Sequence, residues 1–249
     1  MDSKQAMGAT LIPSAALVSF SGGQDSTTAL AWALSRYENV ETVGFRYGQK
    51  HHVELEQRPV IRKAIVELVR DWKNRLGPDH VVHLDLIGQI AGKNIASPPE
   101  HALIAGEGFE AGSRYIPGRN LIMLSMCASV AFRRDIRVLV CGASETEYSG
   151  YPDCRNESMN AIERAISLSS GFDFKIECPL MWLDKARVWE LANSLGGRQL
   201  VEIIRKDTHT CYLGSREEFH EWGYGCGTCP ACRLRAKGWQ DFRGRQSGC

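Results

Sequence analysis

The sequence alternates short apolar runs of strand length with longer segments whose apolar residues recur at helical spacing. Strands are expected at residues 11–20, 40–45, 80–86, 136–142 and 174–179, and helices at 26–37, 53–72, 120–133, 157–169 and 184–195. Strands and helices in this order form a parallel sheet covered by helices on both faces. The pattern predicts an α/β fold with a doubly wound parallel sheet.

Three segments depart from this alternation. Residues 86–118 show no sustained period and are too long for an ordinary connection, so we expect a functional loop or lid there. Pro59 lies inside a helical pattern and should kink or break it near Arg58. From Thr208 onward the alternation stops, and Cys, Gly and basic residues accumulate. We predict an α/β domain over 1–207 and a small metal-binding segment over 208–249 packed on it.

Composition narrows the class of protein. The 249 residues are 43% hydrophobic and 24% charged, which supports a packed core and excludes a disordered or collagen-like chain. The net charge of +1 gives no overall field that would gather nucleic acid or an anionic membrane. The apolar runs are shorter than the roughly 20 residues of a membrane-spanning helix. We expect neither a membrane nor a direct nucleic-acid partner, although residues 233–246 form a local basic stretch.

A glycine-rich loop, SGGQDS, joins the first strand to the first helix. Gly22 and Gly23 allow a sharp turn that brings backbone N–H groups against an anion, and the helix N-terminus adds partial positive charge. The hydroxyls of Ser21 and Ser26 can donate to the same anion, and Asp25 can hold Mg²⁺. The loop lacks the lysine of the common NTPase loop. It predicts a nucleotide phosphate site; an ordinary capped glycine turn is the alternative.

Four cysteines near the C-terminus have metal-ligand spacing: Cys211, then Cys226, Cys229 and Cys232. Four thiolates suit tetrahedral zinc in a closed, structural site, and Gly225 and Gly227 permit the tight turns around it. An iron–sulfur cluster and unliganded redox thiols remain alternatives. Of the other cysteines, Cys127, Cys141 and Cys178 are interpreted as small buried hydrophobes, Cys154 is set apart by its motif, and Cys249 is interpreted as a free tail thiol.

Polar motifs follow several strands, at the edge where open α/β sheets bind ligands. In YSGYPDCR, Tyr148 and Tyr151 offer flat faces to a purine-like ring, Asp153 can accept from its N–H edge, and Arg155 can pair with a carboxylate or phosphate. A tyrosine-decorated loop with a surface ion pair is the alternative.

Three further positions extend this set. Tyr47, followed by Gln49, Lys50 and His51, ends the second strand, where a solvated turn would look similar. Arg119 and Asn120 open a helix, where they attract an anion or simply cap it. Lys185 opens the last long helix and is either a phosphate contact or an exposed charge.

SGGQDS resembles the pyrophosphate loop of the ATP pyrophosphatase (PP-loop) superfamily. Further motifs, in order along residues 15–239, resemble one of its families, the 7-cyano-7-deazaguanine synthases of queuosine biosynthesis. These motifs are FRYGQKHHVELE, YIPGRN, YSGYPDCR, PLMWLDK, THTCY and CGTCPACRLRAKGW.

The resemblance implies an adenine nucleotide alpha hydrolase-like, Rossmann-like fold and a cytoplasmic ligase, commonly a homodimer. It would use ATP with Mg²⁺ to convert 7-carboxy-7-deazaguanine and ammonia to 7-cyano-7-deazaguanine through adenylated intermediates, and hold one structural Zn²⁺. The residues implied as ATP-binding are Phe20, Ser21, Gly22, Gly23, Gln24, Asp25 and Ser26. Those implied as catalytic are Asp25, Ser26 and Lys185. Those implied as substrate-binding are Tyr47, Arg119, Asn120, Tyr148, Tyr151, Asp153 and Arg155.

The chain departs from the family pattern at Ser144 and Glu147, where Asn and Asp are usual. This change puts the substrate in question, so a relative acting on another carboxylate remains an alternative. A tRNA-modifying PP-loop enzyme and a non-catalytic nucleotide-binding zinc module are the others. RNA affinity that is lost with rising salt would identify the tRNA-modifying enzyme. ATP binding without release of pyrophosphate would identify the non-catalytic zinc module.

Overall fold

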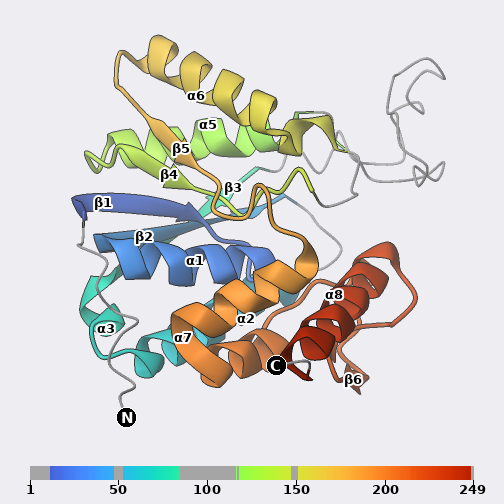
Figure 1. Cartoon of the computed structure of the whole chain (residues 1–249). Helices are drawn as coiled ribbons and strands as arrows, with labels where there is room; N and C mark the ends of the chain where they lie inside the picture. Colours follow the sequence, from blue (N-terminus) through green and yellow to red (C-terminus); the bar gives the residue numbers. More distant parts are fainter. Residues whose placement is uncertain (1–11, 48–52, 85–115, 117, 147–150, 248–249) are drawn as a thin grey trace, which may run out of the picture.

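The computed structural model describes residues 12–47, 53–84, 116, 118–146 and 151–247. Within these residues a five-stranded sheet has the order β3-β2-β1-β4-β5, and each neighbouring pair of strands is parallel (Figure 1). The strands are β1 (Ile12–Ser19), β2 (Tyr37–Arg46), β3 (Leu76–His83), β4 (Val138–Val140) and β5 (Lys175–Glu177). The doubly wound parallel sheet predicted from the sequence is confirmed.

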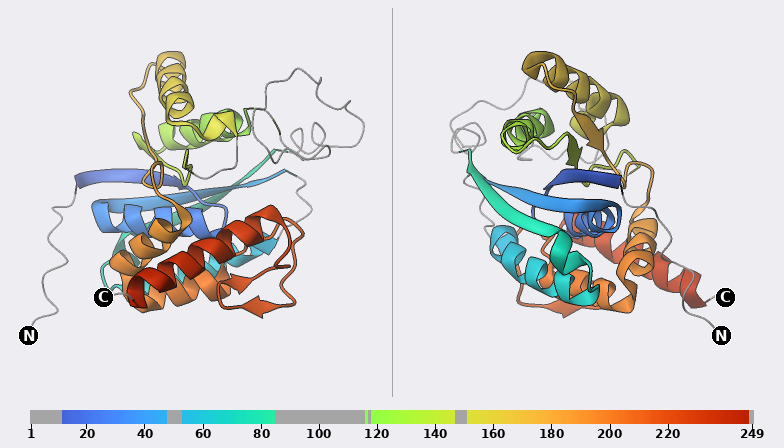
Figure 2. Two further views of the ribbon diagram at one scale, coloured as in Figure 1. Left: turned by 45° about the vertical axis from the view of Figure 1, so that its right-hand side comes forward. Right: turned by 90° about the vertical axis from the view of Figure 1, so that its left-hand side faces the viewer.

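Helices cover both faces of this sheet (Figures 1 and 2). On one side lie α5 (Arg119–Phe132) and α6 (Asn156–Ser170), and on the other α1 (Gln24–Arg36), α2 (Val53–Leu68) and α7 (Lys185–Asp207). Short helices at Trp72–Arg75 (α3) and Pro152–Cys154 (η1) complete this body.

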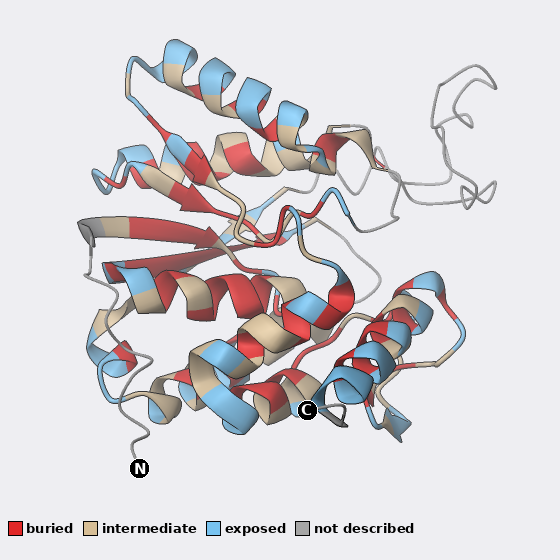
Figure 3. Cartoon of the chain, in the orientation of Figure 1, coloured by how far each residue is buried: buried red, intermediate tan, exposed pale blue. Residues whose placement is uncertain are grey.

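The central strand supplies both faces of the core because successive side chains of a strand point in opposite directions. Ala16 and Val18 pack with the α1 and α7 side, whereas Leu17 packs with the α5 and α6 side. All three side chains are 0% exposed. Figure 3 shows the same burial along the inner surfaces of the helices.

One expectation about helices is wrong, and another covers only the first part of a helix. α2 continues from Val53 to Leu68 through Pro59, so the expected break near Arg58 is wrong. Tertiary contacts hold this stretch: Ile61 and Ile65 are buried, and the buried Arg58 guanidinium donates to the Phe20 carbonyl and to Asp79. The last α/β helix, expected at 184–195, does end there, because α7 has non-helical backbone at Gly196 and Gly197. A second helical stretch of α7, which was not expected, then continues to Asp207.

The C-terminal segment is more regular than its composition indicates. It contains an antiparallel pair, β6 (Phe219–His220) and β7 (Gly223–Tyr224), and a long helix, α8 (Pro230–Ser247), that the sequence pattern did not reveal. Trp239 of α8 packs on Trp189 of α7 with ring centroids 5.1 Å apart. The segment therefore shares the core of the α/β body, and the boundary at 207/208 stays a prediction.

Several predicted features lie outside the described residues. These are most of the 86–118 loop, residues 49–51, Glu147, Tyr148 and Cys249. In the parts of the chain that are described, no helix combines the length and apolar character needed to cross a bilayer.

Candidate active site

The SGGQDS loop forms a compact set of donors at the start of α1. The hydroxyl oxygens of Ser21 and Ser26 lie 3.1 Å apart, the N–H of Gly22 donates to Ser26 at 3.2 Å, and that of Gly23 donates to Ser21 at 3.2 Å. Gly22 has φ +96°, and a Cβ there would lie 2.3 Å from the Glu54 carbonyl oxygen. The sharp turn therefore depends on glycine and directs hydroxyls to the positive end of a helix, which suits an anion.

Asp25 and Lys185 form an ion pair beside this loop. Nζ of Lys185 lies 2.7 Å from each carboxylate oxygen of Asp25. The Lys185 side chain is 5% exposed, whereas Asp25 is 29% exposed. The structure thus places the predicted Lys185 against Asp25, at the first residue of α7, and the expected phosphate contact stays a prediction.

Glu54, which the sequence interpretation did not single out, completes the surroundings of the loop. Its carboxylate accepts a hydrogen bond from Ser21 and interacts electrostatically with Arg119 and Asp25; burial raises its pKa to about 7. In the sequence it is one of two acidic residues in the first turn of α2, so nothing separates it from Glu56. Only the packing of α2 against the glycine loop reveals it.

Tyr47, which follows β2, and Arg119, the first residue of α5, contact each other. Their side chains are hydrogen-bonded, and burial raises the pKa of the Tyr47 hydroxyl. Since Arg119 also acts on Glu54, it supplies positive charge between the loop and the end of β2.

Asn120 and Asp153 bind each other. The Asn120 backbone N–H donates to the Asp153 carboxylate at 2.9 Å, and its side-chain amide donates to the Asp153 carbonyl at 3.1 Å and to the Cys154 sulfur at 3.3 Å. The anion at the start of α5 is therefore the protein's own Asp153, which is 9% exposed. The cap residue of α5 is Gly118, which makes no side-chain cap hydrogen bond, so the capping alternative for Asn120 is not observed. The ligand roles of Asn120 and Asp153 stay predictions.

Other residues of the predicted substrate set differ in exposure. Arg155 is exposed, whereas Tyr151 is of intermediate burial. Ser144, the family departure, is buried, and its hydroxyl donates to the Leu183 carbonyl at 3.3 Å. Ser144 therefore fixes the end of β4 to the segment that leads into α7.

The four predicted metal ligands converge. The Sγ atoms of Cys211, Cys226, Cys229 and Cys232 all lie within 4.8 Å of one another. Those of Cys226 and Cys232 are 3.9 Å apart, and Zn–S bonds of about 2.3 Å place tetrahedral sulfurs about 3.8 Å from each other. The cluster therefore fits a tetrahedral metal ion such as Zn²⁺.

The surroundings of the cluster favour a thiolate at Cys226, and the turns of the cluster require glycine. The Thr228 hydroxyl, together with the backbone N–H of Cys229, lowers the pKa of Cys226 to about 6. A Cβ on Gly225 would lie 2.6 Å from the sulfur of Cys232, and Gly227 has φ +71°. Both glycines are thus needed where the sequence placed tight turns.

The cysteine segment is attached to the glycine loop. The N–H of His209, two residues before Cys211, donates to the Gly22 carbonyl at 3.2 Å. On the other side of the cluster, Arg235 is 0% exposed and donates to the carbonyls of Ile204 and Trp222. Burial lowers its pKa to about 10. A folded cysteine segment is therefore part of the support of the loop.

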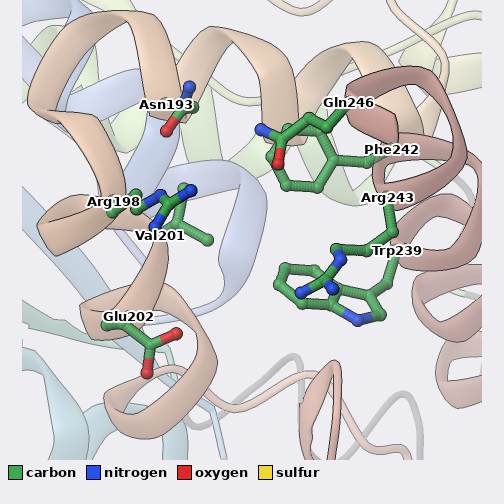
Figure 4. A pocket seen from close by; sticks show the side chains of 8 residues that line it. All are labelled: Asn193, Arg198, Val201, Glu202, Trp239, Phe242, Arg243 and Gln246. Carbon is green, nitrogen blue, oxygen red and sulfur yellow. The ribbon is translucent and has the colours of Figure 1, made fainter. Parts of the chain in front are cut away.

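Two basic residues of the stretch 233–246 make polar contacts within the protein, and Arg233, Lys237 and Arg243 are exposed. Besides the buried Arg235, Arg245 pairs with Asp184 and Glu190 at 3.3 and 3.0 Å. A groove of about 470 Å³ lies between α7 and α8 and is lined by Val201, Trp239, Phe242 and polar residues. Figure 4 shows these side chains. It contains none of the candidate site residues, so we do not place the active site there.

Comparison with known proteins gives a consistent answer. The model of the family described as "Queuosine biosynthesis protein QueC" matches residues 15–243. The chain is 52% identical over 230 residues to 7-cyano-7-deazaguanine synthase of Paraburkholderia phymatum, covering 92% of this chain and 93% of that protein. It is 53% identical over 228 residues to 7-cyano-7-deazaguanine synthase 2 of Sphingopyxis alaskensis, covering 92% and 95%.

A solved structure supports the fold. The complex of a 4-thiouridine synthetase with RNA and bound ATP is similar with a TM-score of 0.50 and 18% identity. The match covers 92% of this chain and 50% of that one. At this identity the likeness concerns the fold alone.

Proposed function

Because the chain belongs to the queuosine biosynthesis protein QueC family, we propose that it is a ligase that makes 7-cyano-7-deazaguanine from 7-carboxy-7-deazaguanine, ammonia and ATP. Its relatives are synthases, and the protein is an enzyme. The observation that carries the proposal is the SGGQDS loop with the Asp25–Lys185 pair beside it.

A nucleotide-binding loop is required because the carboxylate must be activated by ATP before ammonia can react with it. A carboxylate resists attack by ammonia, so one of its oxygens first attacks the α-phosphorus of ATP, and pyrophosphate leaves. Ammonia then displaces AMP, which carries away that oxygen, and one proton is released as the amide forms. A second ATP adenylates the amide oxygen and pyrophosphate leaves; loss of AMP and of both N–H protons then gives the nitrile. One site can serve both steps because both transfer AMP to an oxygen atom that is bonded to the same carbon of the substrate.

The residues act mainly by positioning and neutralising charge. The N–H groups and hydroxyls of residues 21–26 bind the pyrophosphate part of ATP, with Phe20 and Gln24 beside them. Asp25 binds Mg²⁺ supplied with ATP, and Lys185 holds that carboxylate in place and offsets phosphate charge. Tyr47, Arg119, Asn120, Tyr148, Tyr151, Asp153 and Arg155 bind the deazapurine substrate.

One Zn²⁺ is proposed for Cys211, Cys226, Cys229 and Cys232. Four protein ligands leave no open position, so this ion would be structural and would stabilise the segment that supports Gly22 through His209. A homodimer and a cytoplasmic location are proposed from the family resemblance. The net charge of +1 and the burial of Arg235 argue against the tRNA-modifying alternative, although Arg233, Lys237 and Arg243 remain exposed.

Mass spectrometry of a reaction with ATP, Mg²⁺, ammonium and 7-carboxy-7-deazaguanine tests the proposal. We expect the nitrile, with two AMP and two pyrophosphate per product. Amide as the end product would point to a specialised relative, and absence of AMP would overturn the substrate assignment. Arg155→Met should raise KM for the carboxylate with little change in KM for ATP, and the exposed Arg133→Met serves as the matched control.

A further inference from the structure

Two cysteines that the sequence interpretation treated as separate small hydrophobes meet across neighbouring strands. The sulfur atoms of Cys141 and Cys178 lie 3.3 Å apart, although the residues are 37 positions apart in the chain. Each follows the end of its strand, and the Cys141 N–H donates to the Glu177 carbonyl at 3.0 Å, so the two backbones stay in register.

This placement suits a covalent link. Neighbouring strands lie about 4.8 Å apart, within the roughly 4.4–6.8 Å between Cα atoms that disulfides span. Both side chains pack on the α5 and α6 side of the sheet, so they already face each other. Bond formation would require movement of the sulfurs rather than of the strands.

The surroundings of the pair also favour one thiolate. The S–H of Cys178 and the backbone N–H of Ala143 hold the pKa of Cys141 below its usual range, while the pKa of Cys178 is raised. In contrast, burial raises the pKa of Cys127 to about 12 and that of Cys154 to about 11. Cys141 is therefore the sulfur of this pair with the lowered pKa. It is itself 8% exposed, and the neighbouring Cys178 is of intermediate burial, so a small oxidant would have to enter beside Cys178.

We propose that Cys141 and Cys178 form a reversible disulfide when the protein meets a peroxide. The Cys141 thiolate attacks one peroxide oxygen, which yields a sulfenic acid and, after protonation of the leaving hydroxide, water. The Cys178 sulfur then attacks the sulfenic sulfur and water leaves. Two thiols and one hydrogen peroxide thus give one disulfide and two waters, and a dithiol reductant restores both thiols by exchange.

The link would fasten two segments that border the candidate site. Gly142, next to Cys141, packs on Asp25: a Cβ there would lie 3.0 Å from the Asp25 carbonyl carbon. Cys178 begins the segment that leads to Lys185, the partner of Asp25. The disulfide would tie together the supports of both members of that ion pair. The chemistry of the pair itself does not depend on the proposed function.

Peptide mapping tests this proposal on the intact protein. The full chain is treated with hydrogen peroxide, remaining thiols are alkylated in denaturant, and the protein is digested with trypsin. We expect peptide 138–155 linked to peptide 176–185, with loss of two alkylatable thiols per chain, and its disappearance after treatment with dithiothreitol. Cys178→Ala should abolish the link and also slow alkylation of Cys141 at neutral pH several-fold, because the S–H donor is lost.

Cys154→Ser is the matched control, since Cys154 shares a tryptic peptide with Cys141 but should not contribute to the link. Persistence of the 138–155 to 176–185 link in this variant supports the proposal. A disulfide within peptide 138–155, or oxidation confined to the four clustered cysteines while Cys141 and Cys178 remain alkylatable, would overturn it.

Discussion

Lys185 and Asp25 are 160 positions apart in the chain, yet the Lys185 ammonium lies 2.7 Å from both carboxylate oxygens of Asp25. The pair joins the first turn of α1 to the first residue of α7, next to the glycine loop. Because the lysine is almost fully buried, its charge acts on the site with little screening by solvent. This contact makes the start of α7 part of the candidate active site.

Lys185→Gln should lower adenylation of the carboxylate by about 100-fold or more, since charge stabilisation in a buried site is of this size. ATP–pyrophosphate exchange measures this step without the later chemistry. The exposed Lys175→Gln, which loses only a surface pair with Glu163, is the control and should exchange at the wild-type rate. Equal rates in both variants would refute a role for Lys185.

Gly238→Ala should destabilise the protein by about 1–3 kcal/mol, because its Cβ would lie 2.3 Å from Cβ of Lys185. The same substitution should reduce activity by displacing Lys185 from Asp25. Gly244→Ala on the same helix meets nothing within 4 Å and should raise stability by up to about 1 kcal/mol. Urea unfolding of the two variants separates the effect of the clash with Lys185 from the effect of helix propensity. A Gly238→Ala variant as stable as the Gly244→Ala variant would contradict the close packing of Gly238 on Lys185.

Cys229→Ser should remove the bound metal and loosen the C-terminal segment, since binding of structural zinc contributes on the order of 10 kcal/mol to local folding. Elemental analysis should find about one zinc per wild-type chain and far less in the variant. Adenylation should fall with it, because His209 contacts the glycine loop. Cys249→Ser is the control and should keep both metal and activity; a Cys229→Ser protein with full zinc would exclude the cluster as the site.

Glu54→Gln should change how stability depends on pH. The pKa of Glu54 in the folded protein is raised from 4.5 to about 7, so the folded state binds this proton more tightly than the unfolded state does. The stabilisation is complete below the unfolded pKa and is lost as the pH rises through the folded one, by at most about 3 kcal/mol. Glutamine stays neutral, so the variant should gain stability relative to wild type over this range.

Urea unfolding between about pH 5 and pH 8 measures this difference. The exposed Glu56→Gln, two residues further along α2, is the control and should leave the pH dependence as in wild type. Parallel stability curves for Glu54→Gln and wild type would show that Glu54 titrates in the ordinary range.

The sequence by itself determined the sheet and the chemistry-bearing motifs. The alternation of apolar runs is a local pattern, and it was enough to predict the parallel strands and most helices around them. The spacing of Cys226, Cys229 and Cys232 is also local, and these thiols do converge with Cys211. Glycine requirements at Gly22 and Gly227 follow from turn geometry and were confirmed.

The tertiary structure alone decided which distant groups meet. The Asp25–Lys185 pair, Glu54 beside Ser21 and the Cys141–Cys178 contact each join residues from different elements, and no local period encodes such neighbours. Pro59 stayed helical because the packing of α2 outweighed a local preference. Secondary structure depends mainly on residues that are close in the chain, whereas burial and charge pairing depend on residues that the fold brings close in space.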